Sequence, residues 1–450
     1  MLPETLAQGR SNGESWFERS GLKNLLKTPR LLFSPAVILP AFLGLAATFF
    51  VGFALDAIWP TTSRPIIGSG FGESSELDQY LVARGNALAV TREWGAEQAR
   101  LPDVKRGGIF DLLLLHATRT GNAIIESVFR LDPKALAESV ARGYAGVAWL
   151  FGMHPVYGIL YSILKLVIWA FFGGAICRGA ALRFAREENP SLWDVLRFSR
   201  QRWFTFVAAP LIPLGVLFFI AFLLFVAGLF GAIPWIGELA VGLGFMIPIL
   251  AGLAAAVVFI GGMLICPLLA PGISVDDLDP GDAVATAGNL VVERPWKYIS
   301  FMLMALVYGA FCLWLIKLVV ALGLWLASAS LGASMNWGNA ATIGAGGANN
   351  SVDDKLTAMW QAPRPGDNRP FYGTFDGPTL RFPSSWAQRG IRAWIFVLWG
   401  FVAAFAVGFY YAASTIIYFI IRRDVNETDM EEVYLDKTDT LPAAAGTSAS

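Results

Sequence analysis

Six long runs of apolar residues constrain this 450-residue chain more than any other feature of its sequence. An α-helix rises about 1.5 Å per residue, so about 20 apolar residues cross the roughly 30 Å hydrocarbon core of a bilayer. The six runs are long enough and cover residues 33–58, 155–177, 204–232, 239–269, 298–327 and 394–421. The sequence therefore predicts an all-α integral membrane protein with six transmembrane helices.

The composition agrees with this fold class. Hydrophobic residues make up 55% of the chain and charged residues only 15%, whereas a soluble domain carries about 25% charged residues. The formal net charge is zero, so the chain has no overall attraction for nucleic acid and we expect no such partner. The first run begins farther from the N-terminus than the apolar core of a cleaved signal peptide, so we expect it to stay as the first span.

The sequence carries no motif for catalysis or metal binding. It has no P-loop, no GxSxG and no HExxH, and its three Cys and two His do not form CxxC or HxxxH spacings. We therefore expect no enzyme activity, no cofactor and no metal site. His154 stands directly before Pro155 at the start of the second run, and we interpret it as a cap at the entry to that span.

Basic residues set the predicted orientation. They cluster before the first run, after the second, before the fifth and after the sixth, while the short loop GAIPWIGE contains no Lys or Arg. Basic loops remain in the cytoplasm, so both termini are predicted to be cytoplasmic. The long segments 59–154 and 328–393 are then outside.

The segments between the spans complete the predicted organisation. They are a cytoplasmic N-terminal segment (1–32), a mostly helical external segment (59–154), an interfacial helix (178–203), an acidic loop and helix (270–297), an external loop (328–393) and a cytoplasmic tail that is disordered at its end (422–450). The two external segments are expected to form a small cap. Residues 107–129 have an apolar core with charged interruptions, which favours an amphipathic helix over a seventh span.

Two stretches resemble each other and predict an internal repeat. FFGGAIC at 171–177 corresponds to FIGGMLIC at 259–266, and each is followed by a Pro beside acidic residues and then by a basic residue and a Trp. Spans two and three are therefore predicted to be a duplicate of spans four and five, which gives repeated helical hairpins, and an origin of all six spans from three hairpins stays open.

The polar linkers of the two copies differ in charge. The first is rich in Arg and aromatic residues, which favours a helix in the plane of the interface. Its residues predicted to contact lipid headgroups are Arg183, Arg186, Arg197, Arg200, Arg202 and Trp203. The second copy is acidic, with Asp279 interpreted as a helix cap, and we expect it to pair with the basic first copy.

Charged residues within or beside the spans form a candidate intramembrane polar site. Each such residue costs roughly 3 kcal/mol unless it is paired or hydrated. Lys165 lies ten residues into the second span, and Lys317 lies in the fifth, where it could pair with Glu238 or Asp56. Lys165 has no evident acidic partner, so snorkelling, a structural hydrogen bond and a role in anion binding or an aqueous path all stay open.

Small residues recur every four positions in the fourth and sixth spans. Such residues allow helices to approach closely in lipid. The positions expected to pack are Gly244, Gly252, Gly400, Ala404 and Gly408. We predict packing of the sixth span against the fourth, with homodimerisation as the alternative.

Two resemblances accompany these patterns. STIIYFIIRRDVNETDMEEVYL at 414–435, with the Arg-rich loop after GGAIC, resembles a group of uncharacterised bacterial multi-pass inner-membrane proteins. This resemblance implies a location in the inner membrane of a bacterium. The repeated hairpin with its interfacial helix is similar to the membrane domain of some bacterial glycerophosphodiester phosphodiesterases. That similarity covers spans two to five. It implies no catalytic residues, because the catalytic domain of those enzymes has no counterpart here.

The sequence thus predicts a multi-pass membrane protein without catalytic chemistry, a membrane scaffold, assembly or partner-binding protein. The alternative is a transporter, a channel or a transporter accessory subunit with Lys165 in the path. The expected partners are membrane lipids and either a membrane-protein partner or a second copy of the chain.

Overall fold

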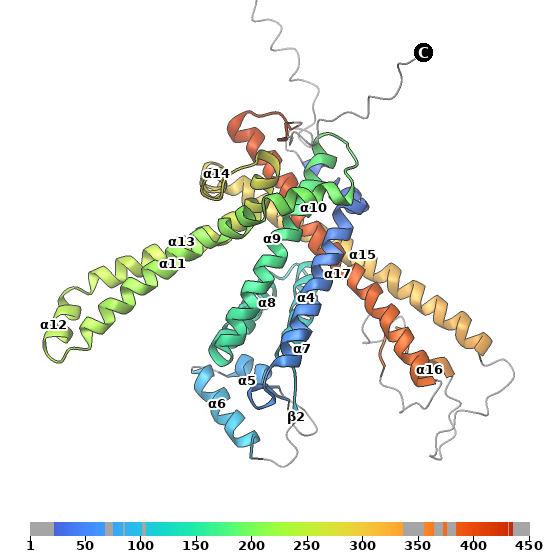
Figure 1. Ribbon diagram of the computed structural model, residues 1–450, viewed down its shortest axis with the longest axis horizontal. Coiled ribbons are helices and arrows are strands. Elements are labelled where there is room, and N and C mark those ends of the chain that lie inside the picture. The colour runs from blue at the N-terminus through green and yellow to red at the C-terminus, as the bar shows by residue number, and fades with distance from the viewer. Residues whose placement is uncertain are drawn as a thin grey trace, which may run out of the picture. The chain divides into compact units, whose positions relative to one another are not determined.

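A computed structural model describes residues 22–67, 75–83, 86–100, 105–335, 355–363, 372–375, 384–430 and 432–434. Six of its helices are long and apolar enough to cross a membrane (Figure 1). They are α4 (Pro35–Ile58), α9 (Pro155–Ala185), α11 (Trp203–Gly231), α13 (Met246–Asp276), α15 (Pro295–Met335) and α17 (Ser384–Asn426). The predicted all-α membrane fold is confirmed.

Several predicted boundaries need correction. α9 does not end at Cys177, where the predicted span stops, but continues to Ala185, and α17 begins ten residues before the predicted sixth span. The predicted fourth span is broken, because α12 (Ile236–Leu243) ends before α13 begins at Met246. Pro248 explains where α13 begins, since its missing N–H falls in the first turn, where no intrahelical partner exists.

The shorter elements fill the segments between the spans. They are α2 (Leu22–Leu25), α3 (Thr28–Leu32), η2 (Thr61–Ser63), β1 (Ile66–Ile67), α5 (Glu76–Val82), α6 (Ala87–Gln98), β2 (Lys105–Arg106), α7 (Ile109–Phe129), α8 (Pro133–Met153), α10 (Leu192–Gln201), α14 (Pro280–Glu293) and α16 (Lys355–Met359). The strands β1 and β2 pair antiparallel. The segment 59–154 is mostly helical, as predicted, and α7 coincides with the predicted amphipathic helix. Much of the predicted N-terminal segment, external loop 328–393 and tail lies outside the described residues.

The chain divides into two compact units. The first comprises Met1–His116, Tyr144–Ala305 and Gly408–Ser450, and the second comprises Ala117–Gly143 and Leu306–Val407. In the first unit, α4 packs along α9, α9 packs against α13, and α11 lies beside α13 (Figure 1). In the second unit, the rings of Phe129 and Trp314 lie 5.7 Å apart. Each unit is described by itself below.

A short helix follows both α9 and α13. α10 begins with a capping box between Ser191 and Asp194, buries Val195 and Phe198, and exposes Trp193 on its other face. α14 begins at the N-cap residue Asp279, as interpreted from the sequence, although its side chain makes no capping hydrogen bond. Both hairpins therefore have the order long helix, short helix, long helix, and their origin by duplication stays a prediction.

Buried arginines hold α9, α13 and α17 together at one end, which we call the arginine end. Arg178 of α9 is 1% exposed and donates a 3.0 Å hydrogen bond to the carbonyl of Ser274 on α13. Arg422 of α17 pairs with Asp276 of α13. A buried charge needs such partners in a medium of low dielectric constant, so these contacts fix the register of the three helices.

The predicted pairing of the basic and acidic linkers is confirmed at this same end. Arg202, which follows α10, forms an ion pair with Asp277, the C-cap residue of α13. Asp277 has a φ of 56°, so the chain turns through a left-handed residue there. The ion pair therefore joins the two linkers at the point where α13 ends.

Candidate functional site

One face of α9 carries a polar or aromatic side chain at every fourth position. Tyr157, Tyr161, Lys165 and Trp169 follow one another at this spacing. Residues four apart lie above one another on one face of an α-helix. We call these four residues the polar stripe. It begins near Asp56 of α4, at the end of the helices that we call the aspartate end.

Asp56 is buried at the head of the polar stripe. Its carboxylate accepts a 2.9 Å hydrogen bond from the hydroxyl of Tyr157 and a 3.0 Å bond from the backbone N–H of Phe110. Gly108 leaves room for this carboxylate, because a Cβ there would overlap Asp56 Oδ2. Donors on two elements, α9 and α7, thus satisfy one buried carboxylate, which would be costly to bury without partners.

A second carboxylate lies close to Asp56. The same Cβ position on Gly108 would be 2.9 Å from Oδ2 of Asp111, in the first turn of α7. Burial, and then the negative charge of Asp56, raise the pKa of Asp111 above its usual value. The aspartate end therefore holds two carboxylates on either side of one glycine.

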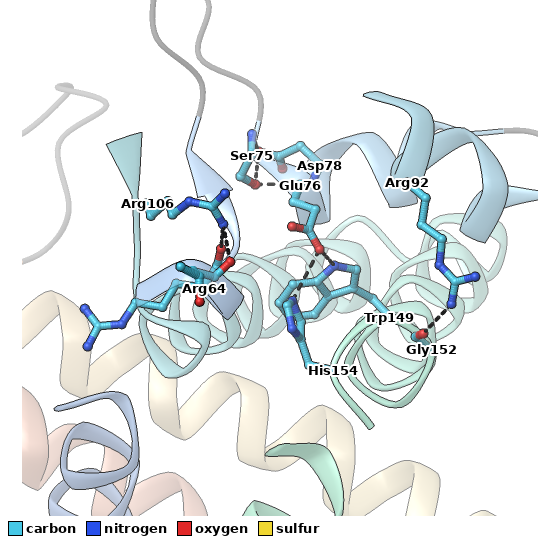
Figure 2. A network of polar contacts seen from close by, with 10 residues as sticks. Arg64, Ser75, Glu76, Asp78, Arg92, Arg106, Trp149, Gly152 and His154 are labelled. Atoms are coloured by element: carbon cyan, nitrogen blue, oxygen red, sulfur yellow. Dashed lines mark hydrogen bonds and ion pairs between the residues drawn. The ribbon is translucent and has the colours of Figure 1, made fainter. Parts of the chain in front are cut away.

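Glu76 joins the short helix α5 to the start of α9. Its Oε1 lies 3.3 Å from Trp149 Nε1, which donates to it, and 3.3 Å from His154 Nε2 (Figure 2). Glu76 is 6% exposed and Trp149 is fully buried. His154 is the N-cap residue of α9, as interpreted, but its side chain faces Glu76 rather than capping the helix.

Protein covers the polar stripe on both sides of Lys165, whereas Lys165 itself is exposed. Tyr157 is fully buried and Tyr161 is 9% exposed, whereas Lys165 is exposed. Below it, the ring of Trp169 stacks on Tyr411 of α17 at 6.2 Å. The amino group of Lys165 lies 5.9 Å from the centre of the Tyr161 ring. Among the described residues, no carboxylate lies within ion-pair distance of it.

The other predicted members of the polar site lie elsewhere. Lys317 is in the second unit, where it donates a 2.8 Å hydrogen bond to Asn122. Glu238 lies exposed in the first turn of α12. Asp56 does join the stripe, through Tyr157. The predicted pairing of Lys317 with Asp56 or Glu238 joins two separate units and stays a prediction.

The residues predicted to contact lipid fall into two groups. Arg197, Arg200 and Trp203 are exposed. The others have protein partners: Arg202 pairs with Asp277, Arg183 donates to Asn189, and Arg186 pairs with Glu188. Contact of the exposed group with headgroups stays a prediction.

The predicted packing of the sixth span against the fourth needs correction at two glycines. A Cβ built at Gly252 meets no atom within 4 Å in the described part of the chain, so this position contacts no neighbouring helix. At Gly408 a Cβ would lie 2.8 Å from Leu32, so that glycine packs against α3 instead. Gly244 lies at the break between α12 and α13. Gly400 and Ala404 are buried within α17.

The α11–α13 hairpin is the most exposed pair of spans. In the most apolar 18-residue stretch of α11 no residue is buried, and 6% are buried in that of α13, compared with 44% in α4. Besides Gly252, Gly215 and Gly261 have open space around them among the described residues. The two helices pack on each other and otherwise meet the first unit chiefly through α9 and α14.

Comparisons of the chain with protein families, curated proteins and solved structures found no match. Within the described ranges, no group of three His, Cys, Asp or Glu residues could hold a metal ion. The sequence had pointed to Lys165 and Asp56, but not to Tyr157 or Glu76. The four-residue spacing of the polar stripe was the available signal for Tyr157. Glu76 had none, because its partners are more than 70 residues away.

Proposed function

We propose that the protein is a membrane scaffold or assembly protein that binds a membrane-protein partner through the α11–α13 hairpin. One observation carries this proposal: almost no residue in the apolar cores of the two spans is buried, although the other helices of the first unit bury much of theirs. Such a hairpin offers the exposed faces of two helices to another membrane protein.

The shape of the hairpin surface supports this role. Lipid is as apolar as leucine, so helices in a membrane associate through close packing at small residues rather than through the hydrophobic effect. Gly252 has open space around it, and the neighbouring Ala256, one turn on, is also exposed. A partner helix can approach the backbone of α13 closely along this line.

A photo-crosslinking residue at Val257 in native membranes tests the proposal. Val257 is 65% exposed on α13, and Ile163 of α9, which is 53% exposed, is the matched control position. We expect a discrete protein adduct from Val257 and none from Ile163. The mass of the adduct identifies a second copy or another protein as the partner. Only lipid adducts at Val257 would contradict partner binding.

Transport, or an accessory role in transport, is the second candidate. The polar stripe favours it, because the buried Tyr157 and Tyr161 lead from Asp56 towards an exposed Lys165 within a span. An intramembrane charge is a candidate for a transport path. A transporter would keep its activity as a single purified chain in vesicles, whereas a scaffold needs its partner for any phenotype.

The proposal also includes the membrane in which the chain lies and its orientation there. We infer that it lies in a bacterial cytoplasmic membrane with both termini in the cytoplasm. The support is the collection of basic residues at the arginine end and their absence from the loop between α11 and α13. A fluorescent protein fused to the C-terminus should fluoresce, and alkaline phosphatase inserted at Gly231 should be active. The opposite pattern would reverse the orientation.

A further inference from the structure

Lys165 lies within a candidate membrane span. It is ten residues from the start of α9 at Pro155, so its Cα lies about 15 Å along the helix from that end. An ammonium group within a span needs a counter-charge or strong hydrogen-bond acceptors.

The protein supplies only part of this need. The amino group lies 5.9 Å from the centre of the Tyr161 ring, so it meets the negative face of an aromatic ring. In the part of the chain that the structure describes, no carboxylate comes within ion-pair distance of it. The positive charge of Lys165 is therefore not neutralised by a described side chain.

The opening at Lys165 is local. Ile163 and Val167, two residues before and after Lys165, are also exposed, but side chains at this spacing point to the opposite face of the helix. The face that carries Lys165 is buried at Tyr161 on one side. On the other side the Trp169 ring stacks on Tyr411. The exposed Lys165 thus lies between two positions of the same face, Tyr161 and Trp169, that are covered by protein, and its amino group lies near the Tyr161 ring.

From this geometry we propose that Lys165 binds a phosphate group, carried either by a lipid or by a soluble anion. The ammonium offers three donors to the phosphate oxygens. The ring of Tyr161 provides an apolar wall beside the ammonium group, and surroundings of low dielectric constant strengthen the attraction. This binding site does not depend on the partner-binding role of the hairpin. It is compatible with a phosphate group that stays bound and with one that is transported.

The experiment compares the purified wild-type chain with Lys165→Met, which removes the charge and keeps a long helix-forming side chain. One arm measures binding of phosphatidic acid by native mass spectrometry in nanodiscs of phosphatidylcholine and phosphatidic acid. The other arm titrates the detergent-solubilised protein with inorganic phosphate in a calorimeter. We expect one of the two probes to bind the wild type at least about tenfold more tightly than the variant. The arm that responds distinguishes a lipid from a soluble source.

Two further variants complete the test. Lys165→Arg keeps the charge and should retain binding. Lys317→Met removes a span lysine that already bonds to Asn122, and should leave binding unchanged. The proposal is overturned if the wild type binds neither probe, or if Lys165→Met binds both as well as the wild type does. A change in hairpin crosslinking would not affect either result, so the two proposals fail separately.

Discussion

The hydroxyl of Tyr157 on α9 donates a 2.9 Å hydrogen bond to the buried carboxylate of Asp56 at the end of α4. This bond joins the first two spans at the aspartate end. The Trp59 ring meets the ring of Tyr157 edge-on at 5.0 Å and covers the bond from the side. A hydrogen bond to a charged acceptor is stronger than a neutral one, so the contact contributes directly to the packing of α4 on α9.

Tyr157→Phe should destabilise the protein by about 1.5–3 kcal/mol, because it removes a hydrogen bond to a buried carboxylate and leaves the ring in place. Thermal unfolding in detergent, followed by size-exclusion chromatography, measures the change. Tyr161→Phe is the matched control, since its hydroxyl forms no hydrogen bond to a described residue. Equal losses in both variants would show that the Asp56 bond contributes nothing specific.

The Asp111 carboxyl should make stability depend on pH. Its pKa is raised from 3.8 by burial and by Asp56, so the folded chain binds this proton more tightly than the unfolded chain. The stabilisation is complete below the unfolded pKa and is lost as pH rises through the folded pKa. Stability should therefore fall as pH rises above about 4.

Asp111→Asn should flatten this fall, because the amide does not titrate. The check is the melting temperature in detergent, measured at several pH values from about 4 to about 7. Glu138→Gln, on the exposed surface of α8, is the control and should keep the wild-type profile. Parallel profiles for the wild type and Asp111→Asn would rule out Asp111 as the source of the dependence.

Arg422 connects α17 to α13 at the arginine end, together with Tyr418, whose hydroxyl donates a 2.5 Å hydrogen bond to Asp276. Arg422 pairs with Asp276 and donates to the carbonyls of Asp429 and Glu432, so it also holds the chain that follows α17. Removing one member of a buried ion pair costs about 3–5 kcal/mol. Arg422→Met should therefore lower the unfolding free energy by this amount and speed proteolysis after residue 426.

A second substitution distinguishes two causes of this loss: the missing attraction between Arg422 and Asp276, and the carboxylate of Asp276 left without its arginine. Arg422→Met combined with Asp276→Leu should recover part of the stability, because the carboxylate that has lost its arginine is gone, although the hydroxyl of Tyr418 loses its acceptor. The comparison uses unfolding of the single and double variants under the same conditions. If the double variant is less stable than Arg422→Met, then the loss in Arg422→Met does not come from the carboxylate of Asp276 left without its arginine.

The sequence predicted the spans and their linkers well, because both depend on local patterns. Run length and hydropathy located the six membrane helices, and the opposite charges of the linkers anticipated the bond between Arg202 and Asp277. The break before α13 was missed because Gly244 lies inside an uninterrupted apolar run, where hydropathy contains no signal for a turn.

The candidate site was predicted only in part. Lys165 and Asp56 could be recognised in the sequence as charged residues in apolar runs. Their partners, however, depend on which helices pack against each other in the fold. The contacts of Glu76 with Trp149 and His154 join distant segments, and no local periodicity encodes them. Arg178 was assigned to an interfacial linker because it follows an apolar run, yet α9 continues through it and buries it against α13.

Two glycines test whether the hairpin has a neighbour within its own chain. A Cβ at Gly173 would lie 2.7 Å from the ring of Tyr411, whereas one at Gly252 meets no atom within 4 Å in the described residues. Gly173→Ala should therefore destabilise the protein by about 1–3 kcal/mol through overpacking. Gly252→Ala should stabilise it by about 0.5–1 kcal/mol, because alanine favours the helix interior.

Gly252→Leu adds the functional measurement to this pair. It should not lower the melting temperature of the purified chain, and it should abolish the protein adduct from the crosslinker at Val257, because a large side chain blocks close approach of a partner helix. If Gly252→Ala is as destabilising as Gly173→Ala, α13 packs against another helix of its own chain. The exposure that supports partner binding would then be lost, and transport through the polar stripe would become the better explanation.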